Sequence, residues 1–104
     1  MKQLAFRAVY ISPILAGTKT TTLRTPRSGL PAQDDEVAFR CQWHKPPFAY
    51  AYVTGADEVA VRNLTDRHAR ADGFPDARAL RAAIRSDYPD ANRMVIIRFR
   101  VISQ

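Results

Sequence analysis

The chain has 104 residues, of which 46% are hydrophobic and 25% are charged. This length predicts one domain over residues 1–104, and the composition is that of an ordinary globular protein rather than of a disordered chain. Sixteen Lys and Arg against ten Asp and Glu leave a net charge of +6. Such a charge attracts RNA, nucleotides and phosphates, although many proteins are basic without binding any of these.

Two features of the sequence exclude other classes of protein. Cys41 is the single cysteine, so an internal disulfide and a cysteine-based metal cluster are excluded. The first 17 residues, MKQLAFRAVYISPILAG, are interrupted by Arg7 and Pro13. They contain no apolar run of the length that a signal peptide or a membrane span needs. We therefore expect a cytoplasmic location and no membrane partner.

Strand patterns occur near both ends of the chain and in its middle. In RMVIIRFRVI, residues 93–102, apolar residues alternate with Arg98 and Arg100, which predicts a strand with one buried face. Residues 36–41 alternate in the same way and place Cys41 on the apolar face, as a buried and inert thiol. Residues 48–54 place three aromatic residues on one face, opposite two alanines, which predicts a third strand.

Helical patterns lie mainly between these strands. Residues 76–88 carry apolar residues at helical spacing, between Pro75 and Pro89, and predict the most secure helix. Its other side holds the cations Arg78, Arg81 and Arg85, which either face solvent or contact phosphates. Thr65 is the expected N-cap of a shorter helix that ends before Gly73. A short helix over residues 13–16 should end at Gly17 in the left-handed conformation. This order predicts an α+β or barrel architecture.

The segment GTKTTTLR, residues 17–24, concentrates donors and a candidate nucleophile. In a regular strand from residue 18, Thr20, Thr22 and Arg24 share one face and Lys19 faces away. Lys19 and Thr22 can therefore meet only if Lys19 lies in the turn before the strand. A lysine whose pKa is lowered by burial can remove the proton of a threonine hydroxyl. The alternative interpretation is an ordinary edge strand kept soluble by its charges.

Three motifs resemble the ASCH family, whose fold is similar to that of PUA domains. They are ILAGTKTTTLR at residues 14–24, VTGADEVAV leading into LT at residues 53–65, and HARADGF at residues 68–74. The resemblance implies an α+β fold, namely a small PUA-like mixed β-barrel with two or three flanking helices. It also implies binding of RNA or of nucleosides.

A subset of short ASCH proteins, similar in length to this chain, hydrolyses N4-acylcytidines such as N4-acetylcytidine. The working residues of that subset correspond to Lys19, Thr22 and Asp72, where Asp72 replaces a Glu. The resemblance thus implies a cofactor-free amidohydrolase with Thr22 as nucleophile, Lys19 as base and Asp72 as orienting group or acid. Arg24 would hold the substrate's carbonyl oxygen, or it would pair with Asp34 or Asp35 instead.

Other residues admit more than one role. Thr20 and Tyr50 are expected to contact the modified nucleoside, and Tyr50 is also suited to packing in the core. His68 and Asp72 are four residues apart, but a third metal ligand is missing from the pattern, so we expect no metal site. His44 would either border the pocket or face solvent. The alternative function is a non-catalytic RNA-binding module, with a ribonuclease as a weaker possibility because no histidine pair supports it.

Overall fold

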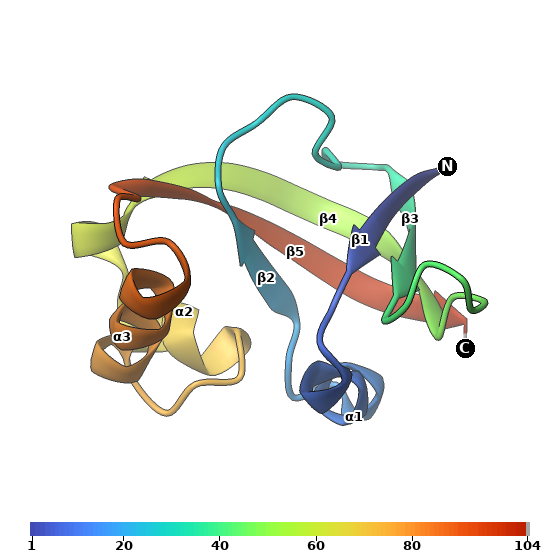
Figure 1. Cartoon of the computed structure of the whole chain (residues 1–104), viewed down its shortest axis with the longest axis horizontal. Helices are drawn as coiled ribbons and strands as arrows, with labels where there is room; N and C mark the ends of the chain where they lie inside the picture. The colour runs from blue at the N-terminus through green and yellow to red at the C-terminus, as the bar shows by residue number, and fades with distance from the viewer. Residues whose placement is uncertain (104) are drawn as a thin grey trace.

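The computed structural model describes residues 1–103 as a mixed sheet with short helices (Figure 1). The elements follow one another along the chain in the order β1 (Lys2–Ala5), the 3₁₀ turn η1 (Ala8–Tyr10), α1 (Ile11–Ala16), β2 (Thr21–Arg24), β3 (Glu36–Arg40), β4 (Ala49–Ala60), the 3₁₀ turn η2 (Val61–Asn63), α2 (Asp66–Ala71), α3 (Ala77–Asp87) and β5 (Arg93–Ser103).

The five strands form one curled sheet in the order β1-β3-β4-β5-β2. Strand β1 pairs with β3 in parallel, and every other pairing is antiparallel. The long strands β4 and β5 run beside each other through the molecule, with register shifts between Tyr50 and Ala51 and between Val53 and Gly55. Such irregularities strengthen the local twist of a sheet. The result is a half-barrel that stays open between its edge strands β1 and β2, which confirms the predicted small PUA-like α+β fold.

One core cluster fills the inside of the half-barrel. Phe39 is fully buried there, and its ring centroid lies 4.7 Å from that of Phe6 and 4.8 Å from that of Phe99. These rings bring β3, β5 and the end of β1 together. The other fully or almost fully buried members of this cluster are Leu4, Ile14, Val37, Ala49, Ala51, Val53 and Ile97.

A second core cluster lies between the sheet and the helices α2 and α3. Its buried members are Leu64, Ala69, Leu80, Ile84, Met94 and Ile96. Strand β5 therefore contributes to both clusters, since Ile97 and Phe99 belong to the first and Met94 and Ile96 to the second. The prediction of one buried face for this strand was wrong over its first half, because the two helices cover the face that was expected to meet solvent.

The buried face of β4 carries its small residues. Ala49, Ala51 and Val53 are fully buried, whereas Tyr50 is 36% exposed. Tyr50 is therefore not a core residue, because it alternates along β4 with the buried Ala49 and Ala51 and so lies on the opposite face of the strand. Cys41 lies just beyond β3 and is partly exposed rather than buried.

The predicted helix ends are confirmed. Thr65 caps α2 by accepting a hydrogen bond from the backbone N–H of His68, whose side chain in turn accepts from the Thr65 N–H. Gly17 and Gly73 both have positive φ, at 81° and 93°, which glycine adopts without the steric cost of a Cβ atom. Over residues 1–103, no helix has the length and apolar character that would let it cross a membrane.

Truncation of Phe39 should measure how far the fold depends on the inner cluster. We expect Phe39→Ala to lower the free energy of unfolding by about 3–5 kcal/mol, because it removes a buried ring and leaves a cavity. The control is Tyr50→Ala on the paired strand β4, which removes a partly exposed ring and should cost less than about 1 kcal/mol. Urea denaturation followed by circular dichroism measures both, and equal losses would contradict the assignment of the core.

Candidate active site

Lys19 lies in the turn between α1 and β2. The helix ends at Gly17, and the backbone N–H groups of Thr18 and Lys19 both donate to the carbonyl of Pro13. The next residue, Thr20, donates its N–H to Ala71 O at 2.8 Å, which ties this turn to the end of α2. Strand β2 begins only at Thr21. The geometric requirement that Lys19 leave the strand is thus confirmed.

Lys19 is 3% exposed, and its ammonium group donates inside the protein. Its Nζ donates to Thr21 O at 2.9 Å, to Asp72 O at 3.1 Å and to Asp72 Oδ1 at 3.1 Å. An ammonium has three donors, so these three acceptors satisfy it. The Tyr10 ring lies beneath the same nitrogen, with 5.0 Å from Nζ to the ring centroid.

Asp72 is the C-cap residue of α2 and is 6% exposed. It is followed by Gly73, whose positive φ turns the chain away from the helix. Besides Lys19, the Asp72 carboxylate accepts a hydrogen bond from Thr21 Oγ1 at 3.2 Å. An aspartate at this position therefore reaches the lysine directly.

Burial acts on both members of this pair. It lowers the pKa of Lys19, whereas the charge of Asp72 and the hydrogen bond that Lys19 donates to Asp72 raise it, and the charge of Arg24 lowers it further. Burial likewise raises the pKa of Asp72, against the opposing effects of Lys19, Thr21 and Arg24. In each case the desolvation of a charged group is the largest cause. The free-energy gap between the ion pair and the neutral pair is therefore smaller than it would be in water.

Thr22 and Arg24 lie on β2 and are joined by a hydrogen bond. Arg24 Nε donates to Thr22 Oγ1 at 3.2 Å, and Arg24 Nη2 donates to Ala5 O at 2.8 Å. The guanidinium also lies 4.9 Å from the ring centroid of Phe6. Burial lowers the pKa of Arg24, yet arginine stays charged at neutral pH. Arg24 therefore connects the two edge strands and directs a positive charge at the Thr22 hydroxyl.

The alternative of a pairing between Arg24 and Asp34 or Asp35 is wrong. Asp35 accepts from Lys2 Nζ at 3.0 Å, and Asp34 accepts from the Tyr52 hydroxyl.

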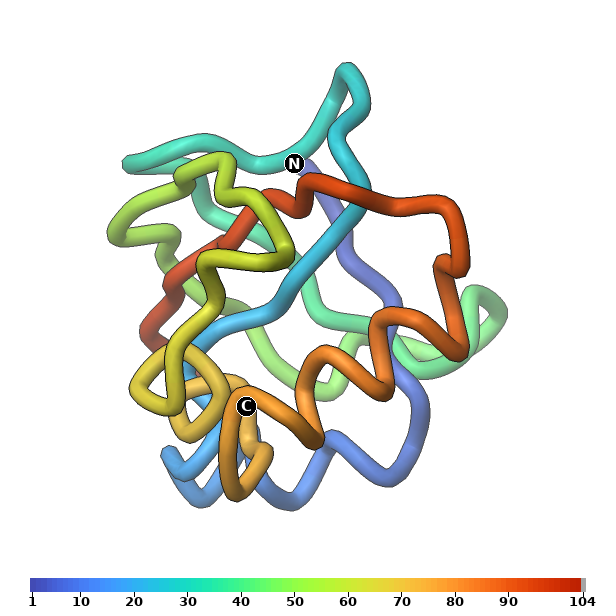
Figure 2. The backbone as a smooth tube through the Cα atoms, turned by 90° about the vertical axis from the view of Figure 1, so that its left-hand side faces the viewer, coloured from blue at the N-terminus to red at the C-terminus, as the bar shows by residue number. Residues whose placement is uncertain are grey.

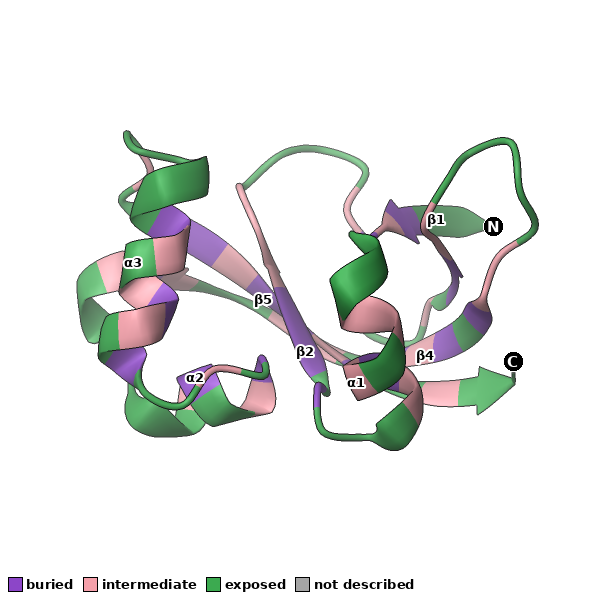
Figure 3. Cartoon of the chain, turned by 60° about the horizontal axis from the view of Figure 1, so that its bottom comes forward, coloured by how far each residue is buried: buried purple, intermediate pink, exposed green. Residues whose placement is uncertain are grey.

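A cavity of about 160 Å³ opens where these residues meet. Lys19, Thr22, Arg24 and Asp72 all line it, and the ion pair between Arg7 and Asp87, at 3.3 Å, also borders it. Figure 3 shows β2, with its buried residues, between α1 on one side and α2 and α3 on the other. The remaining lining residues are Ala5, Phe6, Tyr10, Leu23, Phe74, Leu80, Ala83, Ile84, Tyr88 and Met94.

Two of the expected substrate contacts do not reach this cavity. Thr20 precedes β2, which begins at Thr21. The alternation of side chains along a strand, which predicted Thr20 and Thr22 on one face, therefore does not apply to Thr20. It is exposed and lines a separate cavity together with Thr54, Arg67 and Arg98. Tyr50 lies on β4, outside the lining of either cavity. The prediction that these two residues line the same pocket as Lys19 and Thr22 was wrong.

The aromatic wall of the cavity was not predicted. It consists of Phe6, Tyr10, Phe74 and Tyr88, which come from four separate segments of the chain. Their spacing in the sequence could not predict that they would line one cavity. Tyr88 did stand out as the last apolar position of the predicted helix, but that position pointed to core packing.

The two histidines lie apart from the cavity. His68 Nδ1 accepts from the Thr65 N–H at 3.0 Å, as part of the cap of α2, and Asp72 turns toward Lys19 instead. His44 is exposed in the loop after β3 and does not border the cavity, contrary to one of its two expected roles. Within residues 1–103, no three His, Cys, Asp or Glu side chains lie close enough together to hold a metal ion.

Comparison with known proteins identifies the fold through structure alone. No protein-family model matches the sequence, and no curated protein matches it. The structure is similar to the ASCH domain from Lactobacillus crispatus, with a TM-score of 0.74 and 15% identity over 99% of this chain and 81% of that one. It is also similar to ASCH from Zymomonas mobilis, with a TM-score of 0.72 and 18% identity over 94% of this chain and 65% of that one.

A third similar structure is a protein from Enterococcus faecalis of the family model DUF984. Its TM-score is 0.76, with 16% identity over 99% of this chain and 81% of that one. Two of the three proteins are described as ASCH proteins, and all three align with almost the whole chain. Residues 1–103 therefore have the fold of an ASCH domain.

Proposed function

We propose that this protein is an amidohydrolase that removes the acyl group from N4-acylcytidine. One observation carries the proposal: a buried lysine of lowered pKa, held by Asp72, shares a small cavity with a threonine whose hydroxyl accepts from Arg24. A buried amine, a hydroxyl and a positioned guanidinium are the groups that acyl transfer without a metal requires. The catalytic roles of Lys19, Thr22 and Asp72 remain predictions for mutagenesis to test.

The reaction would proceed in two steps. Thr22 Oγ attacks the amide carbonyl carbon while the neutral Lys19 amine takes the hydroxyl proton, and Arg24 stabilises the developing oxyanion. The C–N bond then breaks, Lys19 returns the proton to the departing N4 of cytidine, and an ester remains on Thr22. Water then attacks the ester carbonyl while Lys19 takes a proton from it. The bond between the acyl carbon and Thr22 Oγ breaks, Lys19 returns the proton to Thr22 Oγ, and the carboxylic acid is released.

For the first step, Lys19 Nζ must give up one of its present hydrogen bonds and accept one from the Thr22 hydroxyl. Among residues 1–103 no hydrogen bond joins Lys19 Nζ to Thr22 Oγ1, since the ammonium donates to Thr21 O and to Asp72. Transfer of one proton, to Asp72 or to solvent, frees a lone pair that can accept from Thr22. Catalytic hydrogen bonds are often absent from a substrate-free enzyme and form in the complex. The raised pKa of Asp72 and the lowered pKa of Lys19 both favour this transfer.

The aromatic wall suits an uncharged base. Tyr10 and Tyr88 contribute aromatic rings with polar hydroxyls to the lining, and Phe6 and Phe74 contribute apolar rings. Aromatic side chains bind nucleobases by stacking, with little dependence on the identity of the base. These residues, rather than Tyr50, would hold the cytosine ring.

Replacement of Lys19 and of Thr22 should abolish most of the activity. Purified protein is incubated with N4-acetylcytidine, and cytidine release is followed by chromatography. We expect Lys19→Ala and Thr22→Ala each to lower kcat by about 10²–10⁴-fold, because each removes a group that acts in the transition state. Thr22→Ser, which keeps a hydroxyl, should retain measurable turnover.

The matched control is Thr54→Ala, an exposed threonine of β4 outside this cavity, which should keep wild-type activity. Thermal unfolding of every variant verifies that it is folded. Turnover that survives both Lys19→Ala and Thr22→Ala would refute the mechanism. Binding of RNA without any turnover by the wild type would favour the non-catalytic module instead.

The pH dependence of kcat/KM should report the Lys19 amine. A base works only when it is deprotonated, so kcat/KM should rise with pH, with a midpoint below the ordinary lysine pKa of 10.5. Asp72→Asn removes the charge that raises this pKa, so the midpoint should move to lower pH even though the maximal rate falls. Asp87→Asn also neutralises a carboxylate at the cavity but should leave the midpoint in place, because Asp87 pairs with Arg7. A midpoint that rises in Asp72→Asn would contradict the assignment.

A further inference from the structure

Three arginines surround a cavity that lies beside the candidate active site and differs from the one beside Thr20. We call it the second cavity. Arg62 comes from η2, and Arg81 and Arg85 come from α3. The cavity has a volume of about 350 Å³, and its other lining residues are Val61, Ile84, Tyr88, Pro89, Ala91 and Asn92. No carboxylate belongs to this lining. Three positive charges therefore face one concave surface without a negative charge among them.

The ion pairs of the described residues leave these three arginines out. The ion pairs of residues 1–103 join Lys2 to Asp35, Arg7 to Asp87, Lys19 to Asp72, Arg93 to Glu58 and Arg98 to Asp57. Arg62, Arg81 and Arg85 take part in none of them. Arg81 Nη1 donates to Leu64 O at 2.9 Å, which fixes its guanidinium, whereas Arg62 and Arg85 make no side-chain hydrogen bond among the described residues.

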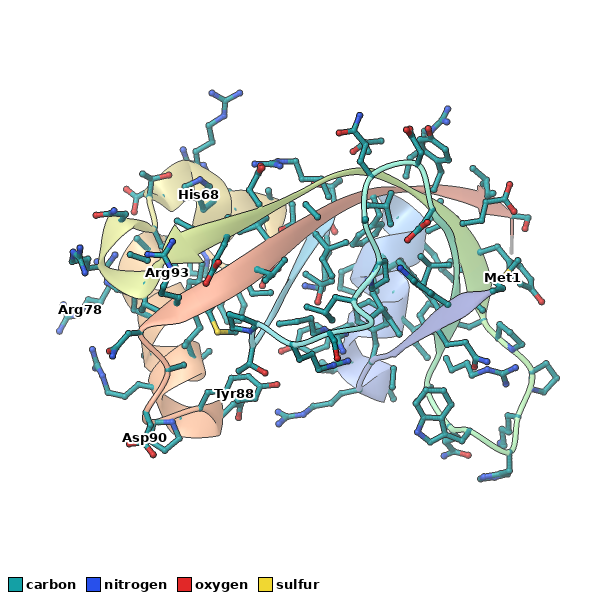
Figure 4. The ribbon with its side chains drawn as sticks, turned by 90° about the horizontal axis from the view of Figure 1, so that it is seen from above. Met1, His68, Arg78, Tyr88, Asp90 and Arg93 are labelled. Carbon is teal, nitrogen blue, oxygen red and sulfur yellow. The ribbon has the colours of Figure 1, made fainter. Side chains whose placement is uncertain are left out.

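The second cavity is adjacent to the first. Ile84 and Tyr88 line both cavities, so only the last turn of α3 separates the three arginines from the candidate active site. Figure 4 shows Tyr88 and Asp90 together at this end of the molecule, while Arg78 points outward from the beginning of α3. Asp90 is exposed and lies outside the lining of either cavity.

From this arrangement we infer that Arg62, Arg81 and Arg85 form a phosphate-binding site. A guanidinium presents a fork of donors that matches phosphate oxygens, and three guanidinium groups without a carboxylate favour an anionic ligand. The inference rests on the proposed function in one respect, namely that the phosphate belongs to the molecule whose acylated base enters the first cavity. The phosphate is then a phosphomonoester of a nucleotide or a phosphodiester of RNA.

Direct binding tests the site apart from catalysis. The probes are cytidine 5′-monophosphate, uncharged cytidine and a fluorescein-labelled single-stranded oligoribonucleotide, measured by calorimetry and by fluorescence anisotropy. We expect the double variant Arg62→Gln and Arg85→Gln to weaken binding of the phosphate-bearing probes by about tenfold or more, because it removes charge-assisted hydrogen bonds. On the RNA arm, the slope of log K against log salt should become shallower by about 0.7 for each phosphate that an arginine no longer neutralises.

The matched control is the double variant Arg70→Gln and Arg78→Gln. It removes the same net charge from two exposed arginines that line neither of these two cavities nor the one beside Thr20, and it should change binding by less than about threefold. Equal weakening by both double variants would overturn the inference, because the effect would then be one of net charge. Binding of the phosphate-bearing probes no tighter than that of cytidine would overturn it as well.

Hydrolysis distinguishes this inference from the proposed function. The ratio of kcat/KM for N4-acetylcytidine 5′-monophosphate to that for N4-acetylcytidine should exceed one in the wild type and fall about tenfold in Arg62→Gln, Arg85→Gln. Tight mononucleotide binding identifies a phosphomonoester, and tight binding of the oligomer alone identifies RNA. Specific binding without hydrolysis of either compound would refute the amidohydrolase and leave the phosphate site supported. Hydrolysis with an unchanged ratio would refute the phosphate site alone.

Discussion

The buried pair of Lys19 and Asp72 holds the candidate site together. It joins the turn after α1 to the end of α2, and through Thr21 it reaches the first residue of β2. Charges buried to this extent stay stable only when they are paired and their remaining donors and acceptors are satisfied. Each of the three Lys19 donors has an acceptor, and none of the buried side-chain polar atoms among residues 1–103 lacks a partner. The hydrogen bonds of this pair are satisfied although the pair is removed from water. The pair therefore connects these segments, and one proton can pass between its two members.

The half-barrel needs a second connection, because its edge strands do not pair. Arg24 supplies it by donating from β2 to Ala5 O at the end of β1, with its guanidinium above Phe6. Figure 2 shows β1 as the dark blue segment that starts at the N-terminus and β2 as a separate, lighter blue segment. The space between two unpaired edges is thus bordered by polar side chains rather than by a ladder of backbone hydrogen bonds. The cavity exists because the barrel does not close.

Local features of this molecule could be read from the sequence, and long-range ones could not. Gly17, Thr65 and Gly73 set helix ends by rules that involve a few neighbouring residues, and the position of Lys19 followed from strand alternation. The second core cluster could not be predicted from the sequence. One face of β5 carries Arg98 and Arg100 in the second half of the strand, which indicated that the whole face meets solvent. In the first half of the strand, however, α2 and α3 cover this face. The role of Tyr50 was wrong for a related reason, since alternation alone could not show that the face of β4 with Ala49 and Ala51 is the buried one.

The distribution of charge separates the two cavities by the ligand each can bind. In the first, the cations Arg7, Lys19 and Arg24 face the carboxylates of Asp72 and Asp87, so one positive charge is uncompensated, and Arg24 places it beside the Thr22 hydroxyl. That balance suits a neutral group on which a single negative charge develops during reaction. In the second, no carboxylate opposes the three arginines, which suits a group that is already anionic. Part of the net positive charge therefore lies in this second cavity. Ile84 and Tyr88, which line both cavities, place it next to the site where the chemistry is proposed.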